Sequence, residues 1–223
     1  MIILMIWVKL FTNFFFSTLS QIAKSAVYLS EKFNMPEQQA EIRLNFYMGP
    51  GSLEPFHANA EMLRGGFQSG LSSGNANMAF YCAVLAAHFS LTSGEKELGA
   101  LMLEIDHYLQ MLKTYKSELA KNILLCIRET VSFLIDKGEA TSIEDKPSYG
   151  DLDDPANMLV ETYHFHQMLR NYWQGYTQRC QYYVEKYESM RRPTRNCDKY
   201  IIKGYQGKFY FGNQFLPQMQ IRQ

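Results

Sequence analysis

The chain has 223 residues, of which 47% are hydrophobic and 20% charged, so it can form a sizeable core and global disorder is excluded. Its 22 basic and 22 acidic residues cancel, which argues against a nucleic-acid-binding protein, since such proteins usually carry a basic excess. The four cysteines form no CxxC pair, so a zinc site or a dithiol redox centre is disfavoured. We expect Cys82, Cys126 and Cys180 to be small buried thiols in a reducing, cytoplasmic compartment; the fourth cysteine is Cys197.

The first segment, Met1–Ser20, is strongly apolar and has two interpretations. A signal sequence or membrane anchor would require a basic start and a long uninterrupted apolar run, whereas Lys9 and Asn13 interrupt this one. We therefore predict a buried helix at the start of a helical stack. Membrane association through Ile2–Phe16 is the alternative.

Proline and glycine divide the rest of the chain into helical segments, because Pro disfavours helix at the residue before it and can itself open a helix. The predicted helices are Ile2–Phe33, Glu37–Tyr47, Pro55–Leu71, Asn75–Leu91, Glu95–Lys116, Glu118–Lys137, Ala156–Trp173, Tyr176–Met190 and Cys197–Leu216. No run alternates convincingly as a strand, so the predicted class is all-α. The segment 139–154 is polar and contains Pro and Gly, which predicts a loop.

Local signals place several helix ends. Asn75 is a predicted N-cap, and Gly94 suits the left-handed position after a helix. Asp154 and Pro155 together predict another helix start. No Gly or Pro separates the two helices around Lys116-Ser117; we predict an antiparallel pair there, because one helix of that length would be unusual.

The most informative pattern is a series of small residues at regular intervals. Glycines recur every four residues and are followed by alanines four and three apart: Gly66, Gly70, Gly74, Ala79, Ala83 and Ala86. This spacing predicts two helices packed closely across a tight turn, since a larger side chain would hold the backbones apart. The offsets from Gly74 recur after Gly175, at Cys180, Val184 and Tyr187. The sequence therefore predicts a right-handed superhelical stack of antiparallel helix pairs, a degenerate tetratricopeptide-like α-solenoid.

Part of the chain also resembles a known family. The run MLRGGFQSGLSSGNANMAFYCAVLAAHFSLTSGEKELGALMLEIDHYLQML, within Met62–Asp136, is similar to the tetratricopeptide-like region of large multidomain signalling ATPases. The later runs NYWQGYTQRCQYYVEKYES and GYQGKFYFGNQFL resemble the next helix pairs of that region. Asn75 and Cys180 depart from the family, which commonly has Asp and Ala there.

The resemblance implies a regulatory helical region attached to an AAA-type, STAND-class ATPase, in some relatives with protein-kinase, GAF, histidine-kinase or cyclase modules. It implies a single repeat domain over 1–223, a fragment of a larger protein, with N-terminal helices in 1–50, the best-resembling repeats in 53–138, a loop in 139–154 and further helix pairs in 155–223. The catalytic chemistry does not carry over, because the chain has no GxxxxGK[ST] motif and no kinase HRD or DFG set. The implied partner is another protein or a neighbouring domain of the same polypeptide.

Candidate chemical groups have simpler structural explanations. His164 and His166 lie two apart on a predicted helix and point in different directions, so they cannot easily share a metal. Glu104 and His107 could meet, but no third ligand is visible. Asp151, Asp153 and Asp154 resemble part of a calcium loop that lacks its glycine and its bidentate Glu, and a helix cap explains them better.

The remaining candidates are an aromatic group and a basic run. Stacking on bases would need a basic groove, so helix packing is the preferred role of the aromatics Tyr163, Phe165, Tyr172, Trp173, Tyr176, Tyr182, Tyr183 and Tyr187. Arg191–Arg195 is predicted to be a solvated turn between helices, with phosphorylation of Thr194 or contact with an acidic surface as the alternatives. No nucleophile signature occurs.

The prediction is a non-catalytic scaffold without cofactor or metal, and an enzyme with an unrecognised site is the alternative. The residues expected to matter are structural: Gly66, Gly70, Gly74, Ala79, Ala83, Ala86, Gly94 and Gly175.

Overall fold

The computed structural model describes residues 18, 20–48, 55–136, 149–150 and 158–189. A helix over 20–32 comes first and is followed by α2 (Pro36–Met48), α3 (Phe56–Ser72), α4 (Ala76–Ser93), α5 (Leu98–Tyr115), α6 (Glu118–Ile135), α7 (Met158–Trp173) and α8 (Thr177–Ser189). These described residues form helices and turns and contain no strand, so the all-α class is confirmed.

Several helix ends lie where local sequence signals predict them. The Asn75 side chain accepts a hydrogen bond from the backbone N–H of Met78 at the start of α4, and Gly94 ends that helix in the left-handed conformation with φ 64°. The junction between α5 and α6 at Lys116-Ser117 is confirmed: Lys116 has φ 54°, and the next helix begins at Glu118. The helix predicted from Glu95 begins later, at Leu98.

Four predicted features lie outside the described residues. They are the apolar segment Ile2–Phe16, most of the loop 139–154, the cap at Asp154 and the helix Cys197–Leu216. Among the helices that the structure does describe, none combines the length and the apolar character needed to cross a bilayer.

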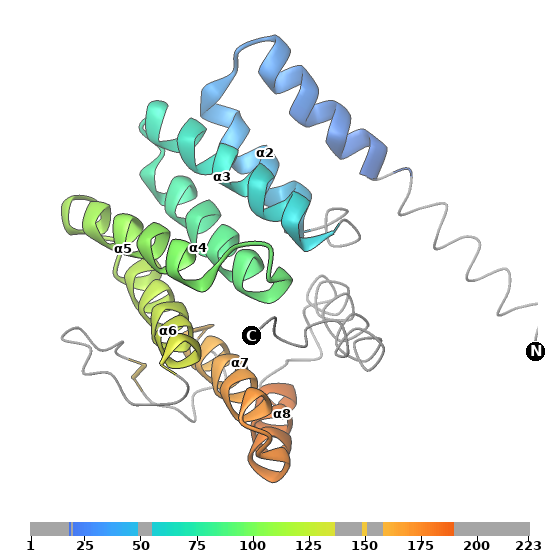
Figure 1. Cartoon of the computed structure of the whole chain (residues 1–223). Helices are drawn as coiled ribbons and strands as arrows, with labels where there is room; N and C mark the ends of the chain where they lie inside the picture. Colours follow the sequence, from blue (N-terminus) through green and yellow to red (C-terminus); the bar gives the residue numbers. More distant parts are fainter. Residues whose placement is uncertain (1–17, 19, 49–54, 137–148, 151–157, 190–223) are drawn as a thin grey trace, which may run out of the picture.

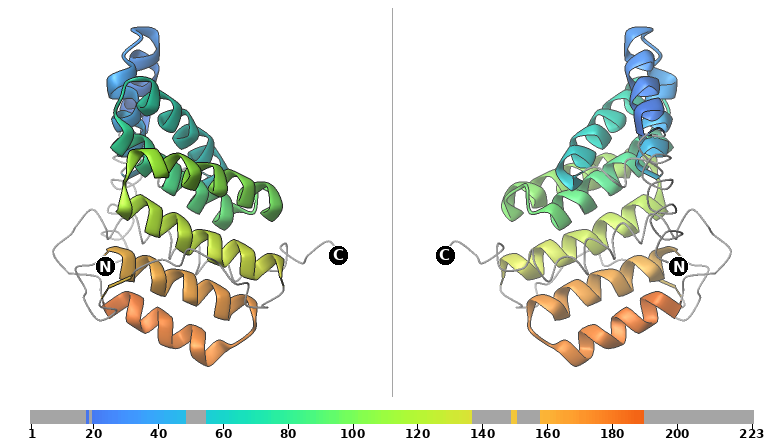
Figure 2. Two further views of the ribbon diagram at one scale, coloured as in Figure 1. Left: turned by 90° about the vertical axis from the view of Figure 1, so that its left-hand side faces the viewer. Right: turned by 90° about the vertical axis from the view of Figure 1, so that its right-hand side faces the viewer.

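The helices stack in chain order, from the 20–32 helix at one end to α8 at the other (Figures 1 and 2). Each helix from α2 onward packs against the next, and α4 additionally contacts α2 and α6. The α4 sequence explains this central position, because it is apolar on all sides and buries nine residues. The main core lies between α3, α4, α5 and α6.

Helices α3 and α4 approach each other closely. A Cβ built on Gly70 would lie 2.9 Å from both the Cβ and the backbone nitrogen of Ala79, and one on Gly66 would lie 2.8 Å from Sγ of Cys82. Non-bonded carbon atoms normally meet at 3.5–4.0 Å, so a side chain at Gly70 would force the helices apart. Gly74, in the turn, has open space around it, but its φ of +79° favours glycine.

Aromatic rings fill the space between these helices and α5. The Phe67 ring meets the Tyr108 ring at a centroid distance of 4.8 Å and the Phe80 ring at 5.8 Å, both edge to face. Phe80 is fully buried. This ring cluster holds α5 against the α3–α4 pair.

Candidate functional site

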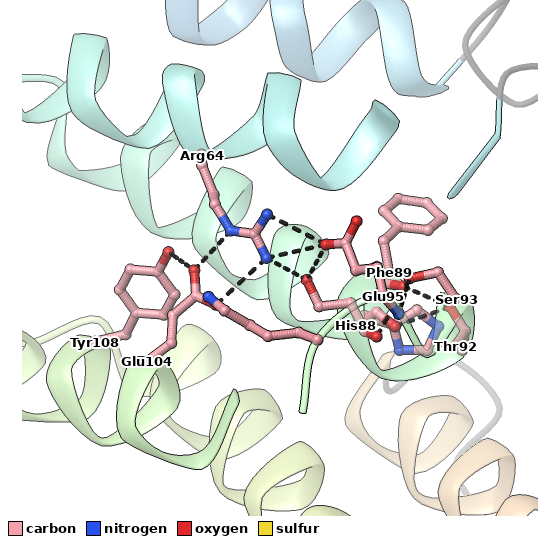
Figure 3. A network of polar contacts seen from close by, with 10 residues as sticks. Arg64, His88, Phe89, Thr92, Ser93, Glu95, Glu104 and Tyr108 are labelled. Carbon is pink, nitrogen blue, oxygen red and sulfur yellow. Dashed lines mark hydrogen bonds and ion pairs between the residues drawn. The ribbon is translucent and has the colours of Figure 1, made fainter. Parts of the chain in front are cut away.

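A network of charged groups connects α3, α4 and α5 (Figure 3). At its centre, Arg64 donates from Nε to Oε1 of Glu104 at 2.8 Å and from both terminal nitrogens to Oε1 of Glu95 at 3.2 Å. Arg64 also donates to the buried Ser90 hydroxyl. Lys96 donates to Oε2 of Glu104 at 2.8 Å.

The network is electrically balanced and satisfied. Burial alone would raise the pKa of Glu104, but hydrogen bonds from Arg64, Lys96 and Tyr108 outweigh it and hold the pKa below its usual value. Burial, together with the charge of Glu104, raises the pKa of Tyr108, so this phenol stays protonated and donates to Glu104 at 2.8 Å. Two cations face two carboxylates, and both oxygens of Glu104 accept hydrogen bonds. We conclude that this arrangement locks three helices together and leaves no group poised for proton transfer.

Sequence reasoning missed this network. Arg64 and Glu104 lie 40 residues apart. The sequence suggests only His107 as a partner for Glu104, yet the Glu104 carboxylate is bonded to Arg64, Lys96 and Tyr108, and His107 is exposed on α5.

The two histidines of α7 are buried and face different neighbours. His166 meets the ring of His88 on α4 at 5.6 Å, whereas His164 meets the ring of Tyr183 on α8 at 5.9 Å. Burial lowers the pKa of His88 to about 4. Burial, aided by His88 and Arg170, lowers the pKa of His166 well below its usual value. The imidazoles of His88 and His166 are therefore neutral at pH 7, and their packing joins α4 to α7.

The described residues hold no cluster of three or more His, Cys, Asp or Glu side chains that could bind a metal. The acidic positions Asp151, Asp153 and Asp154 lie outside the described ranges, as does the basic run Arg191–Arg195. The interpretations of these two segments stay predictions.

The cysteines match their predicted role in part. Cys82 and Cys126 are buried free thiols, and burial raises the pKa of each to about 12, so neither is a thiolate at neutral pH. Cys180 is only partly buried, contrary to the prediction, because its side of α8 is incompletely covered by the described helices. Cys197 is outside the described residues.

The aromatic residues of α7 and α8 also divide into two groups. Phe165 and Tyr187 meet at 6.0 Å, and Tyr163 and Tyr183 at 6.4 Å, as packing between helices requires. Other aromatics are exposed by 38–53%, which corrects the prediction that helix packing accounts for the whole group: Tyr172, Trp173, Tyr176 and Tyr182.

An open groove of about 470 Å³ lies between α7 and α8 and reaches α6. Its lining is polar and aromatic: Phe133, Gln167, Arg170, Asn171, Gln174, Gln178, Arg179, Tyr182 and Tyr183. No carboxylate occurs among these described lining residues. The groove has the amide and guanidinium groups of a binding surface, and it holds no arrangement of nucleophile and base.

Arg170 fixes the floor of the groove to α6. Its Nε donates to the hydroxyl of Thr130 at 3.0 Å, and its Nη2 donates to Glu129 at 3.1 Å. The Arg170 side chain also lies over the Phe133 ring at 5.9 Å. These contacts hold α7 in a defined position on α6 and so give the groove a fixed wall.

Comparisons with known proteins do not identify a family. No family model matches the chain, and no significant match occurs among curated proteins or solved structures.

Proposed function

We propose that this protein is a non-catalytic α-helical repeat scaffold that binds another protein or a neighbouring domain. In this proposal the helix pairs form a degenerate tetratricopeptide-like, right-handed α-solenoid. The observation that carries it is the order of the stack: each helix from α2 to α8 packs on its neighbour in sequence. Stacks built from consecutive pairs expose extended side surfaces, and proteins of this architecture use such surfaces to bind partners.

Two features support an interaction role over a catalytic one. The strongest charged network, around Arg64 and Glu104, is saturated by its own hydrogen bonds. The groove at α7 and α8, by contrast, presents several side-chain amides and the exposed ring of Tyr182. Aromatic and Arg side chains are enriched where proteins bind one another.

The most specific form of this proposal follows the resemblance to the tetratricopeptide-like region of signalling ATPases. In that form the scaffold regulates an attached signalling ATPase or kinase module in the cytoplasm. The free thiols Cys82, Cys126 and Cys180 fit a reducing compartment. Translating the DNA on both sides of the reading frame tests this form, because a Walker-type ATPase sequence would lie upstream.

Site-specific photocrosslinking in the cells that make the protein tests the scaffold itself. A benzophenone amino acid replaces Tyr182, which is 53% exposed beside the groove, and in a matched variant it replaces Leu103, which is 73% exposed on α5. We expect discrete protein adducts from position 182 and few from position 103. Failure to form protein adducts at both positions, or equal diffuse labelling at both, would contradict the proposal.

A further inference from the structure

We propose that the groove between α7 and α8 binds an extended, acidic peptide segment of its partner. This inference rests on the scaffold function proposed above and names the chemistry of what the scaffold binds. It is carried by three properties of the groove: its unpaired amides, its uncompensated cation and its aromatic wall.

The amides match a peptide main chain. Gln167 on α7, Gln174 in the turn directly after it and Gln178 at the start of α8 line the groove, and within the described structure their side-chain amides form no hydrogen bond. A carboxamide offers one acceptor and two donors, so it can bond both the N–H and the C=O of an extended chain. Gln167 and Gln174 are seven residues apart, and the backbone N–H of Gln174 still donates to the carbonyl of Arg170, four residues earlier, as in a helix. The two glutamines therefore lie about 10 Å apart along the α7 axis, which is the length of about three residues of extended peptide.

The charge of the groove selects an acidic segment. Arg170 is already paired with Glu129 below the groove, so its charge is largely compensated. Arg179 is exposed on α8, lies 5.5 Å from the centre of the Tyr176 ring, and forms no ion pair with any described residue. A carboxylate on a bound peptide would give Arg179 a partner, and hydrogen bonds between charged groups are about twice as strong as neutral ones.

The aromatic wall gives such a peptide a surface to pack on. Tyr182 and Tyr183 lie next to each other on α8, with ring centroids 5.2 Å apart, and Tyr182 is half exposed. Tyrosine rings bury apolar area with little loss of side-chain entropy while leaving their hydroxyls free to form hydrogen bonds. The peptide would therefore lie between a polar α7 side and an aromatic α8 side.

Fluorescence anisotropy with three labelled probes tests the inference. The probes are the octapeptide EAEAEAEA, its uncharged analogue QAQAQAQA and a uridine octamer, each titrated with the purified full chain. We expect the acidic peptide to bind at least tenfold more tightly than the uncharged one. The Arg179→Gln variant should weaken acidic-peptide binding about tenfold, equivalent to about 1.4 kcal/mol.

Matched variants separate a specific site from general charge attraction. Lys113 is an exposed cation on α5, away from the groove, so Lys113→Gln should leave binding unchanged. The Arg179→Glu variant should lose the acidic peptide and gain a basic octapeptide, KAKAKAKA. Because both positions are exposed, the melting temperatures of these variants should match that of the unchanged protein.

Three binding results would overturn the inference: equal binding of the acidic and the uncharged octapeptide, no binding of either, or tighter binding of the uridine octamer than of both. An equal effect of Arg179→Gln and Lys113→Gln on acidic-peptide binding would also overturn it. The photocrosslinking experiment shows whether only the acidic-peptide proposal fails or the scaffold proposal fails as well. Protein adducts at position 182 without acidic-peptide binding would remove the proposed ligand chemistry and leave the scaffold standing. Absence of adducts at both tested positions would remove the scaffold itself.

Discussion

The α3–α4 pair and the α7–α8 pair use the same turn but pack differently. Gly74 and Gly175 both lie between two helices with positive φ, +79° and +74°. In each turn the glycine N–H donates to the carbonyl three residues earlier, at 3.2 Å in the first pair and 3.0 Å in the second. The turn is therefore a local property that the two sequences share.

The packing beyond the turn is not shared. In the first pair Gly70 faces Ala79, and Ala79, Ala83, Ala86 and Ala87 of α4 are fully buried. The corresponding positions of the second pair carry Asn171 and Cys180, which are larger, and Cys180 is partly exposed. Helices α2, α5 and α6 also cover the first pair, whereas the described neighbours of the second are α6 and the His88 side chain of α4. Small residues and covering helices together give close packing, and their absence leaves a groove.

The largest expected difference between the pairs comes from removing a ring. Phe80 lies six residues after Gly74, fully buried, and its ring meets those of Phe67 and Tyr115. We expect Phe80→Ala to lower the free energy of unfolding by about 3–5 kcal/mol. Gln181, six residues after Gly175, is exposed, so Gln181→Ala should change the free energy of unfolding by less than about 0.5 kcal/mol. Urea unfolding measures both, and equal losses would show that the pairs are packed alike.

A second pair of substitutions adds volume at matched positions. Ala79→Phe would place a ring where Gly70 already lies in close contact, and we expect a loss of about 1–3 kcal/mol from overpacking. Cys180→Phe should destabilise less, because its side of α8 is partly open. Thermal unfolding followed by circular dichroism compares the two. A larger loss for Cys180→Phe would reverse our view of which helices approach closely.

The junction between the two regions should depend on pH. His88 has a folded-state pKa of about 4, and that of His166 is also lowered, whereas unfolded histidine titrates near 6.5. As the pH falls below about 6.5, the unfolded chain therefore binds more protons than the folded chain does. The free energy of unfolding falls between that pH and about 4. From pH 7 to pH 5 we expect a loss of about 2 kcal/mol from His88, and a further loss from His166.

The variant His166→Leu isolates this contribution. It keeps an apolar group against His88 and removes two buried ring nitrogens that form no hydrogen bond in the described structure. Denaturant titrations at pH 7, 6 and 5 should show a shallower pH dependence than for the unchanged protein. An identical dependence would mean that the histidines do not set it.

The sequence could predict the helices and turns because their signals are local. Asn75, Gly94 and Gly175 act within one turn of their own positions, and each takes the conformation that its residue type favours. The regular spacing of small residues likewise placed Gly70 and Ala79 on facing sides of adjacent helices. Neighbouring helices joined by a short turn leave few other arrangements.

The polar network and the groove could not be predicted in this way. Arg64 and Glu104 come from helices separated by a third one, and no period within either helix points to the other. The exposure of Tyr182 depends on which helices cover α8, and that is a property of the stack. Sequence patterns show which residues share a face, but the partner of that face is decided by the tertiary arrangement.

The smallest expected effect tests what the two pairs have in common. Gly74→Ala and Gly175→Ala would each place a side chain in the left-handed conformation, although no atom lies within 4 Å of the added Cβ. The free energy of unfolding should therefore fall by about 1 kcal/mol at each site, and the loss should come from backbone conformation alone. Gly99, which is in α5 and also has open space, provides the control: Gly99→Ala should stabilise by up to about 1 kcal/mol, since alanine is the better helix former. If Gly175→Ala cost far less than Gly74→Ala in thermal unfolding, the α7–α8 turn would not be held in its observed conformation, and the groove that depends on it would lose its fixed wall.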